Sequence, residues 1–325
     1  MATATLQSPM TSLAVCICTY KRNQLLAQLL TALDEQAFVA VPTPDILVVV
    51  TDNSPDAGAR EAVTQHGGRW TLSYVHEPRP GISHARNACI KAIPAGTQFI
   101  AMIDDDEEPS RHWLEQLLSV QAKSDADIVV GPTVPKFPQG TPEWIAATGF
   151  FLKPQNQREL DEFHPDPPTA TCNVLLRHSL LAGSTRPFDP SMSLSGGEDR
   201  LFFQDLKMKG ASFAWASSAL VTEHFSPGRA TLRYMLREAY RRGCVTYPIK
   251  RALKARSSLH TIKIAVRITV RYSWRFVTHL PLLLFKLGAD RTAWVPVAVN
   301  MAESLGTIAG VFQIPNRHYG DGNTL

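Results

Sequence analysis

Phe99-Ile-Ala-Met-Ile-Asp-Asp-Asp-Glu-Glu-Pro109 joins a run of apolar residues to five consecutive acids. The apolar half predicts a buried strand, so the acids stand at its carboxyl end, where open α/β sheets place their ligands. Crowded carboxylates repel one another, and the run therefore favours a neutralising cation. Oxygen ligands favour Mg²⁺ or Mn²⁺, and such ions usually accompany a phosphate-bearing ligand. The alternative interpretation is a solvated acidic turn before a helix that begins near Arg111.

Apolar runs of strand length recur along the chain and alternate with stretches of helical periodicity. The predicted strands are residues 13–18, 45–51, 72–75, 99–103, 127–130, 172–176 and 212–221, and helices are predicted over residues 25–33, 82–93 and 111–122. The second strand ends at another carboxylate, Asp52. This alternation predicts an α/β fold with a parallel, doubly wound sheet. Residues 132–168 are rich in proline and predict a lid or binding segment.

The composition places the protein among ordinary globular proteins. Its 325 residues suffice for one large domain, or for one domain with an appendage. The five cysteines form no Cys-x-x-Cys pair and no disulfide framework, which indicates a reducing cytosolic compartment. The N-terminus lacks a basic region followed by a long apolar core, so we expect no signal peptide.

Positive charge is concentrated in the C-terminal third of the chain. Residues 229–291 carry 15 Lys and Arg against two Asp and Glu, although the whole chain has a net charge of only +4. Within this segment, residues 230–290 mix basic and apolar residues at helical spacing, which suits an anionic membrane surface. Residues 292–314 are almost uncharged but are interrupted by Pro296, and we expect an interfacial or re-entrant helix pair rather than a true span.

The pattern as a whole resembles the family 2 glycosyltransferases, enzymes with the GT-A fold that use nucleotide diphosphate sugars. The motifs that carry the resemblance are, in order, Cys18-Thr-Tyr-Lys-Arg22, Asp52-Asn53, Pro80-Gly-Ile-Ser-His-Ala-Arg-Asn87, Asp104-Asp-Asp106, Gly197-Glu-Asp199 and His224. Six motifs in the right order are a strong signal, although each alone is weak. The Gly-Gly-Glu-Asp run and the basic tail look most like bacterial exopolysaccharide glycosyltransferases of the succinoglycan type. We therefore expect a GT-A catalytic domain over residues 1–245 and a membrane-associating helical region over residues 246–325.

The resemblance implies roles for individual residues. It assigns nucleotide-sugar binding to Thr19, Tyr20, Arg22, Asp52, Asn53, Arg86, Asp104 and Asp105, and metal binding to Asp104, Asp106 and His224. Asp199 is the expected catalytic base, and Glu198 the expected partner of the donor sugar or the acceptor hydroxyls. Arg229 and Arg233 are weaker candidates for covering the diphosphate.

Each assignment has a plainer structural alternative. Asp52 can form an Asx-turn instead of binding uracil. Arg86 can pair with Glu77, and His224 can be structural. Glu198 and Asp199 can simply complement a helix dipole.

The expected function is an inverting, metal-dependent hexosyl transfer, most simply from a UDP-sugar, with Mg²⁺ or Mn²⁺ as cofactor. The expected acceptor is a saccharide linked to polyprenyl diphosphate at the cytoplasmic face of the plasma membrane. A nucleotidyltransferase is disfavoured because the loop after the first strand, residues 19–23, contains no glycine. A noncatalytic sugar-nucleotide-binding or scaffold subunit is disfavoured by the intact acids. Nucleic-acid binding is disfavoured by the apolar content of the tail.

Overall fold

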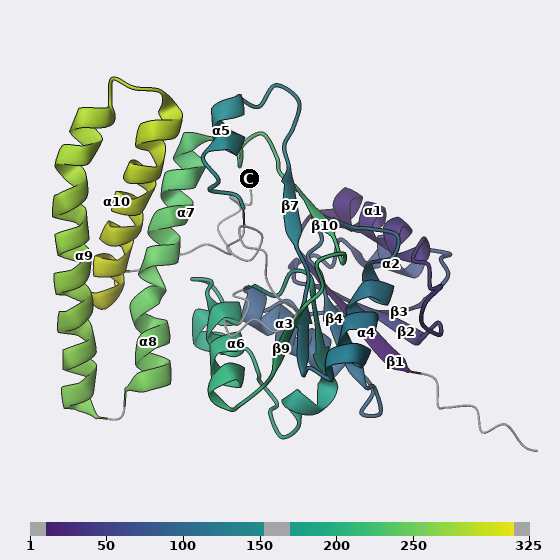
Figure 1. The fold of residues 1–325 in the computed structure, drawn as a ribbon. Coiled ribbons are helices and arrows are strands. Elements are labelled where there is room, and N and C mark those ends of the chain that lie inside the picture. Colours follow the sequence, from purple (N-terminus) through teal and green to yellow (C-terminus); the bar gives the residue numbers. More distant parts are fainter. Residues whose placement is uncertain (1–10, 153–169, 256, 315–325) are drawn as a thin grey trace, which may run out of the picture.

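A seven-stranded mixed sheet forms the centre of the protein, which the computed structural model describes over residues 11–152, 170–255 and 257–314 (Figure 1). The strands are β1 (Ser12–Thr19), β2 (Asp45–Asp52), β3 (Thr71–His76), β4 (Phe99–Met102), β6 (Ile128–Val130), β8 (Val174–Arg177) and β9 (Phe213–Trp215). Their order across the sheet is β3-β2-β1-β4-β8-β6-β9. The first four strands in the chain run parallel, as predicted.

The expectation of a wholly parallel sheet is wrong at β8, which pairs antiparallel with both β4 and β6. A parallel strand needs a crossover of a dozen or more residues, usually a helix, that returns the chain to the opposite edge. Between β6 and β8 the described residues contain only β7 (Thr133–Lys136) and the five-residue helix α5 (Glu143–Ala147). The chain therefore stays near the edge where β6 ends, and β8 begins there and runs back.

Helices cover both faces of the central sheet, as the alternation of side chains along β1 requires. Leu13, Val15 and Ile17 of β1 face a core that includes residues of α1 (Asn23–Asp34) and α4 (Trp113–Ser124). Ala14 and Cys16 face a second core, to which α3 (Ile82–Lys91) and α6 (Glu198–Met208) contribute. A short helix, α2 (Arg60–Thr64), packs beside β3.

A second, three-stranded sheet stands beside the end of β4. It consists of β5 (Glu107–Pro109), β7 and β10 (Val221–His224) in the order β5-β10-β7. The single strand predicted over residues 212–221 is therefore two short strands, β9 and β10, in different sheets. This small sheet matters for function because it fixes the backbone directly after the acids of residues 104–106.

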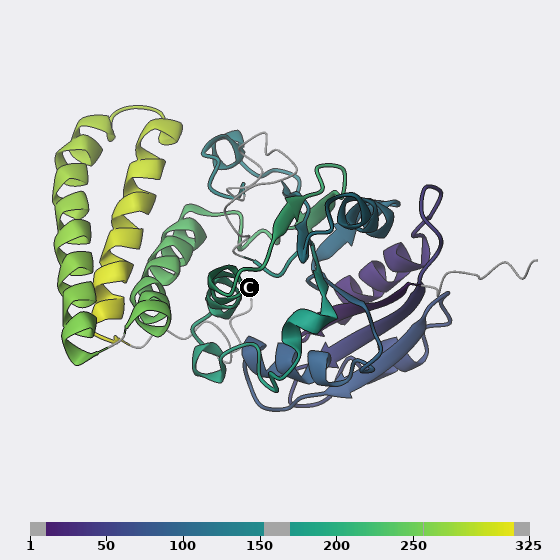
Figure 2. The same cartoon turned by 60° about the horizontal axis from the view of Figure 1, so that its bottom comes forward.

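Four helices form a layer at one side of the molecule (Figures 1 and 2). They are α7 (Leu232–Cys244), α8 (Thr246–Lys254), α9 (Ser258–Lys286) and α10 (Arg291–Val311). α9 lies at the outer edge, and α10 lies between α9 and α7. Among the described residues, no helix combines the length and the apolar character that crossing a bilayer requires.

The apolar character of α10 is explained by packing within the protein. Val295, Val297 and Met301 are buried, and Gly306 approaches α7 so closely that an added Cβ would lie 1.9 Å from the carbonyl oxygen of Tyr240. α10 forms a pair with α9, and it also packs against α7. The predicted boundary at residue 245 falls between α7 and α8, so this contact joins the two proposed domains. Of the predicted lid, residues 153–168 lie outside the described residues.

Candidate active site

The predicted site residues of β1, β2 and β4 lie at neighbouring strand ends. Thr19 pairs with Asp52 in the register of β1 and β2, and Cys16 pairs with Met102 in the register of β1 and β4. The parallel strands therefore deliver Thr19, Asp52 and the acids after Met102 to one edge of the sheet. This is the edge where open α/β sheets bind ligands.

Asp105 and Asp106 are neutralised by arginines of the chain itself. Arg22 Nη1 lies 2.9 Å from Asp105 Oδ1 and 3.0 Å from Asp106 Oδ2, and Arg229 Nη1 lies 2.7 Å from Asp106 Oδ2. The hydroxyl of Thr19 donates to Asp105 Oδ2 at 2.8 Å. Burial raises the pKa of Asp105 to about 6 even though Arg22 opposes the rise. Cations of the protein thus supply part of the charge compensation that the sequence suggested a metal must provide.

Among the three aspartates 104–106, Asp104 is the one whose side chain is open to a ligand. Its side chain is 44% exposed, and its Oδ1 lies 3.6 Å from Arg86 Nη2. One ligand atom each of Asp104, Glu107 and Cys172 lie within 4.8 Å of one another, a grouping that a metal ion can use. The two carboxylates suit a hard divalent cation, whereas the thiol does not. The residues therefore fit a divalent cation at Asp104, with Glu107 beside it.

The predicted metal set of Asp104, Asp106 and His224 is not brought together in this conformation. Asp106 is bound by Arg22 and Arg229, and His224 Nε2 lies 2.8 Å from Glu108 Oε2. The backbone N–H of His224 donates to the carbonyl oxygen of Asp106, so strand pairing rather than a metal holds the two residues near each other.

Asp52 and Asn53 hold the backbone of the loops around them through hydrogen bonds. Asp52 is fully buried; its Oδ1 accepts from Ser54 N at 2.8 Å, and its Oδ2 accepts from Ala59 N at 2.8 Å and from the Tyr74 hydroxyl at 3.0 Å. The Asx-turn that was the plainer alternative for Asp52 is therefore present. Asn53 donates to the carbonyl oxygens of Glu77 and Arg79 and accepts from Gly81 N. Nucleotide binding by Asp52 and Asn53 stays a prediction.

The loop that follows β1 is placed at the same edge. Tyr20 is partly exposed, and Lys21 Nζ lies 5.5 Å from the centre of its ring. Lys21 has a positive φ of 54° and its N–H donates to the Ser54 hydroxyl, which fixes the turn that presents Arg22 to the acids. The structure thus places Thr19 and Arg22 in contact with the acidic run and Tyr20 beside them.

Arg86 connects the acidic run to the start of α6. Its guanidinium pairs with Glu198 Oε1 and faces Asp104, while Glu77, the alternative partner, pairs with Arg79 instead. Burial would lower the pKa of Arg86, but the charges of Glu198, Asp104 and Asp199 raise it above its ordinary value. Arg86 is therefore a permanent cation between two groups of carboxylates.

A close contact of two loops makes this arrangement possible. Gly81, at the start of α3, has φ 119°, and a Cβ there would lie 2.5 Å from Ser193 Cβ. Ile82 N donates to the carbonyl oxygen of Ser193, and Asn87 exchanges two hydrogen bonds with the backbone of Phe188. Only glycine fits this approach, which holds the start of α3 against the segment leading into α6.

Glu198 and Asp199 occupy the first turn of α6, preceded by Gly197 in the left-handed region with φ 87°. Burial and the neighbouring Asp199 raise the pKa of Glu198 to about 7, against the opposing charge of Arg86. Burial also raises the pKa of Asp199, and Arg86 is the largest opposing influence. Glu198 Oε2 is buried without a hydrogen-bond partner among the described residues. Two neighbouring carboxylates with raised pKa values are characteristic of acid–base sites.

The sequence reasoning missed Arg241 and Glu238 of α7. Arg241 makes two hydrogen bonds to the Glu238 carboxylate, at 2.7 and 2.6 Å, and its Nη1 lies 3.5 Å from the carbonyl oxygen of Ser195. Its charge also lowers the pKa values of Glu198 and Asp199. The sequence signal that could have found them is Glu238, the one acid of α7, which stands among four arginines. Of the two arginines proposed to cover the diphosphate, Arg229 contacts the acidic run and Arg233 is exposed.

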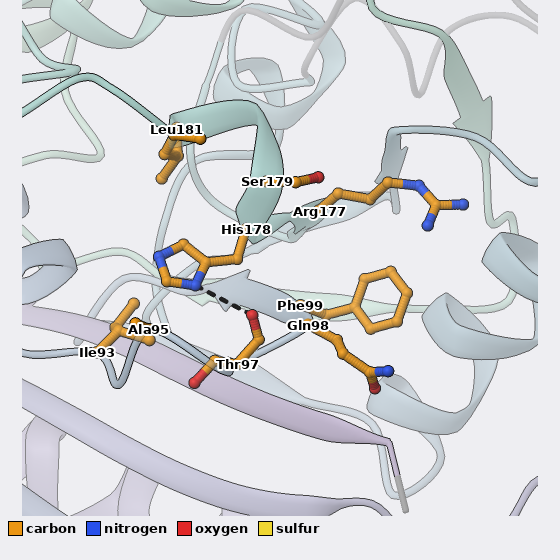
Figure 3. Close-up of a pocket in the computed structure, with 10 residues that line it drawn as sticks. Ile93, Ala95, Thr97, Gln98, Phe99, Arg177, His178, Ser179 and Leu181 are labelled. Atoms are coloured by element: carbon orange, nitrogen blue, oxygen red, sulfur yellow. Dashed lines mark hydrogen bonds between the residues drawn. The ribbon is translucent and has the colours of Figure 1, made fainter. Parts of the chain in front are cut away.

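A cavity of about 600 Å³ lies at the other end of β4 and is not part of this site. Figure 3 shows it between the start of β4 at Phe99 and the residues that follow β8. His178 Nδ1 lies 3.1 Å from the carbonyl oxygen of Thr97 in its lining. The length of β4 separates this cavity from Asp104.

Comparisons with known proteins point to one family. The family described as Glycosyl transferase family 2 matches residues 14–182. The succinoglycan biosynthesis protein ExoM of Rhizobium meliloti (strain 1021) is 31% identical over 236 residues, which cover 70% of this chain and 71% of that protein. The crystal structure of S. aureus TarS 1-349 is similar with a TM-score of 0.53 at 14% identity, covering 93% of this chain and 91% of the other. At that identity the TarS likeness shows a shared fold.

Proposed function

Because this chain belongs to glycosyl transferase family 2, we propose that it transfers a hexose from a UDP-sugar to a saccharide hydroxyl with inversion at the anomeric carbon. Family membership confirms the resemblance drawn from the six motifs. One observation carries the proposal beyond membership: Arg86 links Asp104, at the end of β4, to Glu198 and Asp199, at the start of α6. A donor diphosphate at Asp104 and an acceptor at α6 would then lie on either side of one cation.

Asp199 is the proposed base. It accepts the proton of the acceptor hydroxyl, the hydroxyl oxygen bonds to the anomeric carbon, and the bond from that carbon to the diphosphate oxygen breaks. The nucleotide diphosphate leaves with the bonding electron pair. The raised pKa of Asp199 supports this role because a base near the working pH accepts a proton more readily. Glu198 is held by Arg86, and its buried, unpartnered Oε2 supports a role in binding a sugar hydroxyl.

The arginines around the acidic run support binding of a diphosphate. Arg22 and Arg229 are held near Asp106, and phosphate oxygens are alternative partners of the same geometry for a guanidinium. If the donor takes these arginines, Asp106 is released beside Asp104. A divalent cation bound there would stabilise the charge that develops on the leaving diphosphate. Mg²⁺ and Mn²⁺ both match the hardness of these ligands.

A saccharide linked to polyprenyl diphosphate, at the cytoplasmic face of the plasma membrane, is the proposed acceptor. Two features support it. The curated relative is named for succinoglycan biosynthesis, and positive charge is concentrated in the C-terminal helices. Neither feature identifies the sugars.

Replacing Asp199 with Asn tests the base. We expect transfer to fall about 10²–10⁴-fold, because the acceptor hydroxyl loses its proton acceptor. Calorimetric titration of UDP in the presence of Mn²⁺ should give nearly the same affinity for the variant and the wild type, and EDTA should abolish that binding in both. Asp205→Asn is the matched control, because Asp205 lies in the same helix and pairs at the surface with Lys209.

Full activity of Asp199→Asn would overturn the base assignment, and UDP binding that ignores EDTA would overturn the metal. Absence of any sugar transfer by the wild-type protein, across a panel of UDP-sugars and saccharide acceptors, would favour the scaffold alternative. Release of pyrophosphate instead of UDP would favour a nucleotidyltransferase.

A further inference from the structure

α9 lies at the outer edge of the molecule (Figure 1). It exposes a long stripe of apolar side chains. The exposed large apolar residues of this helix include Leu259, Ile262, Val266, Val270, Trp274 and Phe285, with Trp274 at 71% and Phe285 at 86% exposure. In contrast, Ile268 is the one fully buried apolar residue of α9 in the described structure. Contiguous apolar exposure on this scale marks an interaction surface.

Basic residues run alongside this stripe. Lys263, Arg267 and Arg271 follow one another at intervals of four residues and are exposed, which places them on one face of the helix. None of the three lies within ion-pair distance of a carboxylate among the described residues, and α9 contains no Asp or Glu. Arg275 differs, because it turns inward and pairs with Glu303 of α10 at 2.9 Å.

α8 adds further positive charge next to the same face. Lys250 is partly buried, and its pKa is lowered by burial and by the positive charges of Arg200, Arg271, Lys254 and Arg267. These cations therefore lie close enough to repel one another. A surface that keeps such uncompensated charge is complementary to an anionic partner.

We propose that α9 docks on an anionic phospholipid surface, lying in the plane of the membrane. The apolar stripe enters the boundary between headgroups and acyl chains, while Lys263, Arg267 and Arg271 contact lipid phosphates. This surface would bring the site to a lipid-linked acceptor. That role rests on the proposed function, whereas the docking of α9 on lipid does not. A second copy of this chain is disfavoured as the occupant, because an antiparallel two-fold contact of α9 would place the two basic rows on the same side of the interface.

Vesicle binding by the full-length protein tests this surface. We expect sedimentation with vesicles of phosphatidylglycerol and phosphatidylcholine, and little with phosphatidylcholine alone. Arg267→Gln with Arg271→Gln should weaken vesicle binding about 30-fold. Each basic residue near an anionic surface contributes about 1 kcal/mol, and about 1.4 kcal/mol corresponds to a tenfold change in affinity. Val266→Glu with Val270→Glu should weaken it at least about tenfold. High salt should also weaken vesicle binding by the wild-type protein.

Matched controls lie on the opposite part of the molecule. Val39 is an exposed valine between α1 and β2, and Lys123 is exposed in the last turn of α4, so Val39→Glu and Lys123→Gln should bind vesicles like the wild type. All α9 variants should keep the circular dichroism of the wild type, because the changed side chains are exposed.

If both α9 double variants bind anionic vesicles as tightly as the wild type, the proposal is overturned. Binding that does not distinguish anionic from neutral vesicles would also overturn it. A concentration-dependent dimer that Val266→Glu with Val270→Glu dissolves would show that a second copy covers the stripe instead. Failure of the transferase proposal is seen separately, because UDP release with a soluble acceptor requires no vesicle.

Discussion

Arg86 satisfies two groups of acids with one buried guanidinium. It pairs with Glu198 and faces Asp104, and it lies 5.6 Å from the centre of the Phe188 ring. An ammonium could not serve both groups in the same plane. Arg86 and Glu198 are both buried, which strengthens their interaction, and burial raises the pKa of Glu198.

The raised pKa of Glu198 makes the stability of the protein depend on pH. The pKa of about 7 in the folded state lies above the ordinary value of 4.5, so the folded protein binds the proton more tightly than the unfolded chain. Stability should therefore fall as pH rises from about 5 to 7, by about 3 kcal/mol from this residue alone. Urea unfolding at several pH values measures it.

Glu198→Gln is the matching variant for this prediction, because it keeps the shape of the side chain and cannot ionise. Its free energy of unfolding should lack this component of the pH dependence. Glu35→Gln is the control, because it makes the same change at an exposed glutamate. A wild-type stability that rises between pH 5 and 7 with the same slope in Glu198→Gln would contradict the assignment.

The contact of α10 with α7 depends on glycines. An added Cβ would lie 1.9 Å from Tyr240 O at Gly306, 2.2 Å from Glu303 O at Gly243 and 2.2 Å from Cys244 O at Gly310. We expect Gly306→Ala to lower the free energy of unfolding by at least about 2 kcal/mol, because the helices must move apart. Gly288→Ala is the control, since nothing lies within 4 Å of an added Cβ there. Equal urea midpoints for the two variants would show that α10 is not packed this way.

Sequence periodicity predicted elements better than it predicted their partners. The strands that end at Thr19 and Asp52 and the strand before Asp104 were found because apolar runs and strand-end acids are local signals. The direction of β8 was not found, because it depends on where the chain lies after β6. Similarly, the apolar residues of α10 indicated burial, but burial against α7 and burial in a bilayer produce the same composition.

For the candidate site as well, the sequence predicted individual residues better than their contacts. Motif order located Arg86, Asp104 and Glu198, which the structure brings together. It did not predict that Arg22 and Arg229 neutralise Asp106, because that contact joins residues more than 80 positions apart. Motif order also could not predict the contact of His224 with Glu108, because this contact follows from the pairing of β10 with β5.

The basic C-terminal segment has two surfaces with different roles across the whole molecule. Arg229 pairs with Asp106 of the candidate site and Arg241 pairs with Glu238, whereas Lys263 and Arg267 are exposed on the outer helix. The helical layer between them therefore connects the site to the proposed membrane surface. Because Tyr234 of α7 contacts Arg229 and α7 also packs against α10, the helical layer is joined to the candidate site.

A chain cut after residue 245 tests this integration. Removing α8–α10 uncovers buried residues of α7, among them Met235 and Cys244, and takes Ile249 away from Gly197, whereas Val245 remains. We expect the shortened protein to aggregate or to unfold at much lower urea than the full chain, because apolar surface on α7 is exposed to water.

The full-length protein should unfold in one cooperative transition when tryptophan fluorescence and circular dichroism are compared. A chain that ends at residue 314 keeps every described helix and serves as the control. A stable, monomeric 1–245 fragment with the UDP affinity of the full chain would show that the predicted boundary separates two independent domains. If the fragment aggregates or unfolds, truncation cannot test release from membranes, because losing the helices would also damage the site next to Gly197. Surface substitutions on α9 are then the means to separate membrane binding from catalysis.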